Sequence, residues 1–159
     1  MIPTMPLVIA SGNAGKVREF AALLLDLPLE VRPQPEGLDV EETGATFAEN
    51  ARLKAEAVAR ATGCWALADD SGLAVEALGG APGVLSARYA PSDPKRIARL
   101  LAELAAVDAT TPERRGAAFV AALALADPSG RVRLAVEGRC AGVITDAPRG
   151  EGGFGYDPV

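Results

Sequence analysis

Residues 65–73 read Trp-Ala-Leu-Ala-Asp-Asp-Ser-Gly-Leu, a short apolar run followed directly by two carboxylates and a small polar pair. The apolar run predicts a buried strand, and Ser71-Gly72 predicts a tight turn after it. Carboxylates at the rigid end of a strand, beside a turn, can hold a hard metal ion. An ordinary turn of Asp, Ser and Gly explains the same residues, so the segment alone leaves both interpretations open.

The segments before this stretch alternate between strand and helix patterns. Apolar spacing predicts strands over 7–10 and 29–31 and helices over 17–25 and 46–61. Thr46 and Glu49 form a capping-box pattern at the start of the second helix.

The segments after it predict a further helix and more strands. Asp93-Pro94 is the expected helix start, and the turn 127–130 predicts a hairpin. The expected strands are 73–78, 117–126, 132–138 and one that includes 143–144. Helices that alternate with strands early and a hairpin later predict an α/β fold with a mixed sheet and flanking helices.

Composition limits the classes of function. At 159 residues the chain is expected to form one domain, over 1–159. Its net charge of −5 and the lack of a Lys/Arg run argue against nucleic acid as a partner. The sequence has no run long enough to span a membrane and no secretory signal pattern, so we expect a cytoplasmic protein. It also has no histidine, so carboxylates, lysines and backbone amides must carry any catalysis.

A glycine-containing loop follows the first predicted strand. Its residues are Ser11, Gly12, Asn13, Ala14, Gly15 and Lys16. A loop between a strand and a helix can bind phosphate through free backbone N–H groups and the helix dipole. The spacing is not that of a Walker A loop, and a plain strand-to-helix turn is the alternative.

Lys54 lies four residues after Asn50, near the middle of the apolar face of the second helix. A lysine on a buried stripe is rarely a solvated charge. It either pairs with a buried carboxylate or reaches into a cleft, and we favour a contact with phosphate or carboxylate.

Two further segments indicate a function only in combination with the others. Glu41 and Glu42 form an acidic pair in a loop, which by itself is typical of solvated surface. Residues 153–157 combine glycines that allow close backbone approach with two aromatic rings that could stack on a base. A bulged strand with core aromatics is the alternative for the second segment.

Together these segments resemble the RdgB/inosine triphosphatase family of non-standard purine nucleotide pyrophosphatases. The resemblance rests on residues 11–16, 41–51, 67–84, 86–89 and 152–158, in that order along nearly the whole chain. It implies a two-lobed fold with a central cleft. The implied activity is Mg²⁺-dependent hydrolysis of ITP, dITP and XTP to the monophosphate and pyrophosphate, which cleanses the nucleotide pool. Members are usually homodimers.

The resemblance also implies roles for individual residues. Residues 11–16 and Lys54 would contact the triphosphate, and Glu41 and Asp70 would hold Mg²⁺. Asp70 would also be the base that prepares the attacking water, and Ser71 would contact the substrate. The base pocket would include Phe154, Gly155, Tyr156 and Asp157. Asp69 is either a second metal contact or the residue that shapes the turn.

The family pattern continues beyond Val159 with a strand region, a Ser-His-Arg motif and a final helix, which this sequence does not contain. The missing segment leaves open a nucleotide-binding protein without turnover. A second alternative is a Maf-like pyrophosphatase for modified nucleotides, which has a related fold but normally has arginine where this chain has Lys16.

Overall fold

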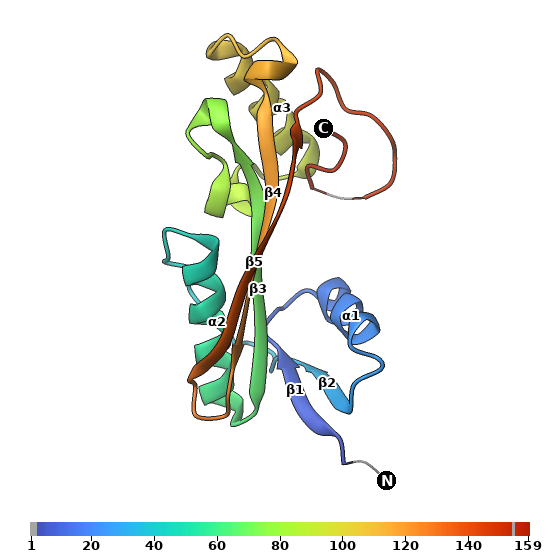
Figure 1. Cartoon of the computed structure of the whole chain (residues 1–159), viewed down its shortest axis with the longest axis vertical. Helices are drawn as coiled ribbons and strands as arrows, with labels where there is room; N and C mark the ends of the chain where they lie inside the picture. Colours follow the sequence, from blue (N-terminus) through green and yellow to red (C-terminus); the bar gives the residue numbers. More distant parts are fainter. Residues whose placement is uncertain (1–2, 154) are drawn as a thin grey trace. The chain divides into compact units, whose positions relative to one another are not determined.

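The computed structural model of the chain describes residues 3–153 and 155–159. Its five strands hydrogen-bond in the order β2-β1-β3-β4-β5, and helices accompany the sheet (Figure 1). β1 pairs in parallel with both β2 and β3, whereas β4 and β5 follow each other through a tight turn and run antiparallel. The predicted α/β fold with a mixed sheet is confirmed. No helix among the described residues is long and apolar enough to cross a membrane.

The chain divides into two compact units. The first comprises the residues up to Asp70 together with Ala122–Glu137, and the second comprises Ser71–Ala121 and Gly138–Val159. β3 (Trp65–Val75), β4 (Gly116–Ala126) and β5 (Val132–Val143) contribute residues to both units.

The first unit is built around β1 (Met5–Ile9), with β2 (Leu29–Pro33) and the helices α1 (Ala14–Leu23) and α2 (Phe47–Thr62). α2 packs against β1 through small side chains that are fully buried. The core residues of these two elements are Leu7, Val8, Ile9, Phe47, Ala51, Ala55, Val58 and Ala59. Alanine on the inner face of α2 lets the helix lie close to the sheet.

The ends of α2 follow from its sequence. The Thr46 hydroxyl accepts a hydrogen bond from the Glu49 N–H at 3.1 Å, and the Glu49 carboxylate accepts one from the Ala45 N–H at 2.8 Å. The helix ends at Gly63, whose φ of 65° is the left-handed conformation that glycine favours. The predicted capping is confirmed, with Glu49 reaching one residue further back than in the usual capping box.

The predicted Ser71-Gly72 turn is wrong. Residues 65–75 form one continuous strand, and the expected second strand at 73–78 is the end of β3 followed by a short 3₁₀ helix over Glu76–Leu78. Position 72 favours glycine because a Cβ there would lie 2.4 Å from the Ser86 hydroxyl oxygen. That hydroxyl accepts from the Leu73 N–H and donates to the Gly83 carbonyl. The glycine therefore allows a close approach within a strand.

In the second unit, α3 (Asp93–Ala106) packs its apolar stripe into a core with the end of β3. This core includes Leu73, Val75, Tyr89, Ile97, Leu100, Leu104, Ala109, Ala117, Ile144 and Tyr156. The expected start of α3 is displaced by one residue, since Ser92 holds the cap position and Asp93 is the first helical residue.

The second unit also contains a buried arginine that the sequence did not single out. Arg115 donates hydrogen bonds to the carbonyl oxygens of Ala109, Ile144 and Thr145 at 2.7–2.9 Å. Its side chain thus joins the backbone at Ala109 to the adjacent carbonyl groups of Ile144 and Thr145.

Candidate active site

Two lysines and three carboxylates gather in the first unit. The Lys16 ammonium lies 3.0 Å from Asp69 Oδ2, and the Lys54 ammonium lies 3.2 Å from Glu42 Oε1. Asp70 completes this group, which we call the lysine–carboxylate cluster, because both lysines and Glu42 act on its ionisation. Lys16 and Lys54 are two of the three lysines in the whole sequence. The pairing of Lys54 with Glu42 shows that the apolar face of α2 carries an inward-facing cation.

Asp70 sits in an unfavourable position for a charge. It is 8% exposed, and its Oδ2 is buried without a hydrogen-bond partner among the described residues. Burial raises the pKa of this carboxyl above its ordinary value of 3.8, and the negative charge of Glu42 raises it further. Lys54, the Asn50 amide and Lys16 oppose that rise in pKa. A desolvated carboxylate with an unused oxygen beside two cations is suited to accept a proton or to bind a cation.

Asn50 links Asp70 to the acidic loop, and sequence reasoning assigned it no role at the site. Its side chain is completely buried, and its Oδ1 accepts the Gly44 N–H at 2.7 Å. The amide lies near enough to lower the pKa of Asp70, although neither Asn50 Nδ2 nor Asp70 Oδ2 completes a hydrogen bond of good geometry. A Cβ at Gly44 would lie 2.6 Å from Asn50 Oδ1, so only glycine fits this contact. The signal in the sequence was an amide on the buried face of a helix.

The glycine-containing loop is shorter than predicted. α1 begins at Ala14, so that Ala14, Gly15 and Lys16 form its first turn, and only Ser11, Gly12 and Asn13 precede it. Asn13 caps the helix by accepting the Gly15 and Lys16 N–H groups at 2.8 and 3.4 Å. The expected helix start at residue 17 is wrong, because an asparagine cap starts the helix where the loop was predicted. The Lys16 side chain nonetheless reaches the cluster from this first turn.

The two residues of the acidic pair, Glu41 and Glu42, lie in different environments. Glu41 is exposed, whereas Glu42 is partly buried and holds Lys54. Among the described residues no three His, Cys, Asp or Glu side chains form a group that could alone enclose a metal ion. The orphaned oxygen of Asp70 still fits Mg²⁺, because this ion is commonly bound by one or two carboxylates with water and substrate phosphates as its other ligands.

The remaining predicted residues belong to the second unit. Ser71 is exposed at the point where β3 enters that unit. Tyr156 is buried in its core, and the phenol donates to the Ser86 carbonyl at 2.7 Å, while burial raises its pKa to about 12. The Gly155 N–H donates to Asp93 Oδ2 at 2.9 Å, and Asp157 is exposed. Phe154 lies outside the described residues. A role for this segment in binding a base stays a prediction.

Comparison with known proteins assigns the chain to a family. Residues 7–159 match the model of the Ham1 family. A protein of Parasynechococcus marenigrum named dITP/XTP pyrophosphatase is 65% identical over 96% of this chain and 76% of its own length. One of the same name from Gloeobacter violaceus is 57% identical over 96% of this chain and 75% of its own length.

Solved structures agree with that match. A HAM1 protein from Coxiella burnetii superposes with a TM-score of 0.91 at 44% identity, covering 98% of this chain and 81% of that one. A nucleoside-triphosphatase / dITP/XTP pyrophosphatase from Mycobacterium abscessus superposes with a TM-score of 0.83 at 45% identity, covering 98% of this chain and 82% of that one. The ordered motifs, the mixed-sheet fold and these similarities lead to one conclusion: the chain belongs to the Ham1 family, as its sequence resemblance predicts.

Proposed function

We propose that this chain is a dITP/XTP pyrophosphatase that hydrolyses dITP, ITP and XTP to the nucleoside monophosphate and pyrophosphate. The observation that carries the proposal is the buried oxygen of Asp70, which has no hydrogen-bond partner among the described residues and whose carboxyl feels the charges of Lys16 and Lys54. Relatives of the same family that are 53–67% identical to the chain carry this name. A triphosphate brings concentrated negative charge, and the two lysines are the cations placed to receive it.

Each residue of the lysine–carboxylate cluster takes a part in this proposal. Asp70 accepts the proton of the attacking water, because its raised pKa makes the carboxylate a stronger base than an exposed aspartate. Lys16 and Lys54 bind phosphate oxygens, while Asp69 and Glu42 hold the two ammonium groups in place until substrate arrives. Residues 11–16 add the dipole of the α1 N-terminus.

We also propose that Mg²⁺ is the cofactor, with Asp70 as one ligand and Glu41 or Glu42 as the candidate second ligand. When bound, the ion would neutralise phosphate charge and lower the pKa of a water molecule beside it. The resemblance further supports a homodimer that acts in the cytoplasm. Sedimentation velocity would test the dimer, and a single species of 16.3 kDa would contradict it.

The reaction products test the function directly. With dITP and Mg²⁺ we expect dIMP and pyrophosphate, separated by ion-exchange chromatography, because hydrolysis falls between the α- and β-phosphates. Asp70→Asn should lower kcat by about 100-fold or more, the contribution typical of a general base. Asp26→Asn, an exposed carboxylate without contacts to the cluster, is the control and should retain full activity. Release of dIDP and orthophosphate, or binding of dITP without turnover, would reject the proposal.

A further inference from the structure

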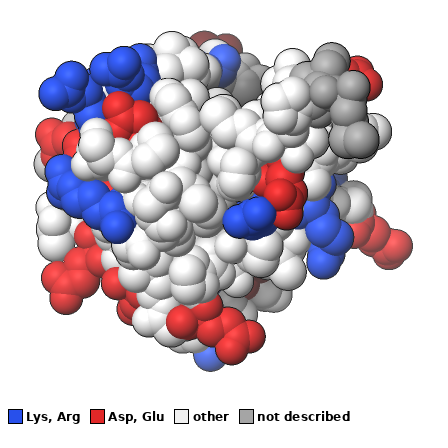
Figure 2. All heavy atoms as spheres, turned by 90° about the horizontal axis from the view of Figure 1, so that it is seen from below, with Lys and Arg blue, Asp and Glu red and all other residues white. Residues whose placement is uncertain are grey.

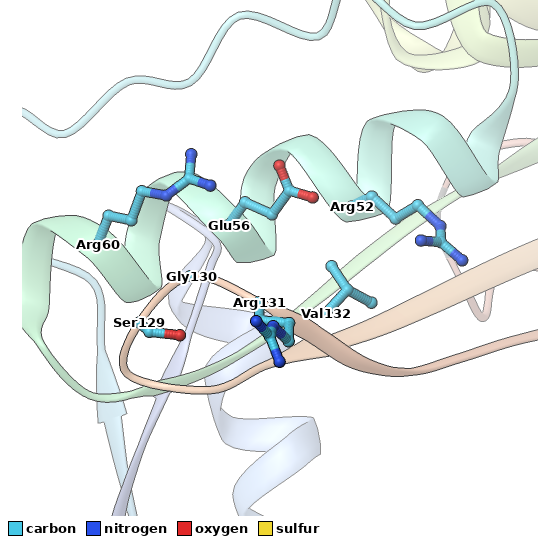
Figure 3. Close-up of a pocket in the computed structure, with 7 residues that line it drawn as sticks. All are labelled: Arg52, Glu56, Arg60, Ser129, Gly130, Arg131 and Val132. Atoms are coloured by element: carbon cyan, nitrogen blue, oxygen red, sulfur yellow. The ribbon is translucent and has the colours of Figure 1, made fainter.

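A second group of cations lies on the first unit. It shares no residue with the lysine–carboxylate cluster. Arginines from α2 and from the turn between β4 and β5 line a pocket of about 440 Å³ (Figure 3). A volume of this size accommodates a small ligand. The lining residues include Arg52, Glu56, Arg60, Ser129, Gly130 and Arg131.

The spacing on α2 places the three charged residues that line the pocket in one row along the helix. Arg52, Glu56 and Arg60 are four residues apart, and Figure 3 shows them following one another along the helix with the turn beside them. Eight residues of helix span about 12 Å, so the two guanidinium groups of α2 can contact separate parts of one ligand.

The guanidinium groups of this pocket are not neutralised by the protein. Within the described part of the chain, Arg52, Arg60 and Arg131 make no ion pair, although Glu56 stands between the first two at the spacing of a helical pair. By contrast, Arg133 on the same hairpin pairs with Asp127 at 3.6 Å. The pocket therefore keeps a net positive charge on a chain whose overall charge is −5.

The turn is shaped to receive one of these arginines. Gly130 is buried with φ of 86°, and a Cβ there would lie 2.5 Å from Cγ and Nε of Arg60. Asp127 closes the turn by accepting the N–H groups of Ser129 and Arg131 at 2.9 and 3.1 Å. Glycine thus lets the stem of Arg60 lie against backbone, which limits the freedom of its guanidinium group.

We propose that this pocket is a second binding site for a small phosphorylated metabolite. Arginine binds phosphate oxygens through paired N–H groups, and three unpaired guanidinium groups with one carboxylate suit a compound that carries phosphate and a hydroxyl or amino donor. A nucleic acid is the less favoured ligand, because on the face seen in Figure 2 basic side chains are interspersed with acidic ones and uncharged surface predominates.

A titration with pyrophosphate in metal-free buffer, followed by amide NMR signals, tests the proposal. We expect saturable shifts of the Ser129, Gly130 and Arg131 amides. The double variant Arg60→Gln/Arg131→Gln should weaken this binding by tenfold or more, as expected for lost hydrogen bonds to a charged group. Arg133→Gln removes one positive charge from the same hairpin but outside the pocket, and should leave the affinity unchanged. Glu56→Gln should tighten binding by about threefold, because one repulsive charge is removed at a distance of several ångströms.

A variant of the lysine–carboxylate cluster distinguishes binding at the pocket from binding at the proposed catalytic site. Lys16→Gln/Lys54→Gln should leave the shifts of the three turn amides in place, whatever it does to turnover. Unchanged turn amides in millimolar pyrophosphate would overturn the proposal. So would shifts that vanish in the lysine variant or persist in the arginine variant, or saturable binding of a short oligonucleotide without binding of pyrophosphate. Failure here would leave the proposed hydrolysis of dITP unaffected, since the products assay does not involve this pocket.

Discussion

At the scale of single residues, Asp70 combines burial with charge. Its carboxylate is removed from water and has one oxygen without a hydrogen-bond partner in the described part of the chain, while two lysines partly compensate. Such a group costs folding free energy in the ionised state and offers a basic oxygen in return. The stability of the fold and the chemistry of the site therefore place opposite demands on this residue.

Replacing Asp70 should reveal that cost. The folded-state pKa lies above the unfolded value of 3.8, so the penalty is fully present above the folded pKa and is relieved as the pH falls through it. Without metal, Asp70→Asn should therefore raise the free energy of unfolding at pH 7, and this gain should disappear as the pH approaches 3.8. Urea unfolding in chelator-containing buffer measures both values. A gain that persists at low pH would contradict the assigned cause.

Asn50 offers a second test at this scale. Asn50→Asp keeps an acceptor for the Gly44 N–H but brings another negative charge to Asp70. That charge should raise the pKa of Asp70 further, so the acid limb of the kcat profile for dITP should move to higher pH. Asn50→Ala serves for comparison, because it removes the acceptor and should cost roughly 1–3 kcal/mol of stability. An unmoved acid limb in a folded Asn50→Asp protein would exclude coupling between these two side chains.

At the scale of elements, β3 is a strand of 11 residues that reads in sequence as two short ones. Gly72 gives the impression of a break because glycine is common in turns, but the contact with Ser86 uses its missing side chain in an extended strand. In the same way, Asn13 turns part of an expected loop into helix. In both cases the residue type is common in several conformations, and a contact with a specific neighbour decides which one it adopts.

Arg115 shows how much one side chain contributes to the second unit. Arg115→Met should lower the free energy of unfolding by on the order of 3 kcal/mol, because three carbonyl oxygens lose a charged donor. Arg114→Met is the matched control, since this exposed neighbour makes only a 3.4 Å bond to the Asp108 carbonyl and should change stability by less than about 0.5 kcal/mol. Equal effects of the two substitutions, measured by urea unfolding, would contradict the structural role of Arg115.

At the scale of the whole molecule, a chain with a net negative charge is proposed to bind a highly charged anion. With a net charge of −5, the overall field repels a triphosphate, so in the proposed function attraction must come from local cations and from the proposed Mg²⁺. The pairing of Lys16 with Asp69 and of Lys54 with Glu42 means that these cations are held in place before substrate binds.

Metal linkage provides a measurement on the whole chain. Mg²⁺ at about 100 times its dissociation constant should stabilise the folded protein by about 2.7 kcal/mol and raise Tm accordingly. Asp70→Asn should abolish most of this shift, while Asp127→Asn on the β4–β5 turn should retain it. Differential scanning calorimetry with and without chelator measures the effect. The same shift in the Asp70→Asn protein would remove this residue from the list of metal ligands.

The sequence by itself determined the family, the alternation of helices and strands and the main candidate residues. Local patterns carry this information: apolar periodicity, the cap at Thr46, and the grouping of glycine, lysine and aspartate. Tertiary structure alone decided that β3 is continuous, that Asn50 joins Gly44 to the surroundings of Asp70, and that Glu42 rather than Glu41 holds Lys54. These features depend on contacts between residues far apart in the chain. Which of two adjacent glutamates meets a lysine is decided by packing, because neither local propensity nor spacing distinguishes them.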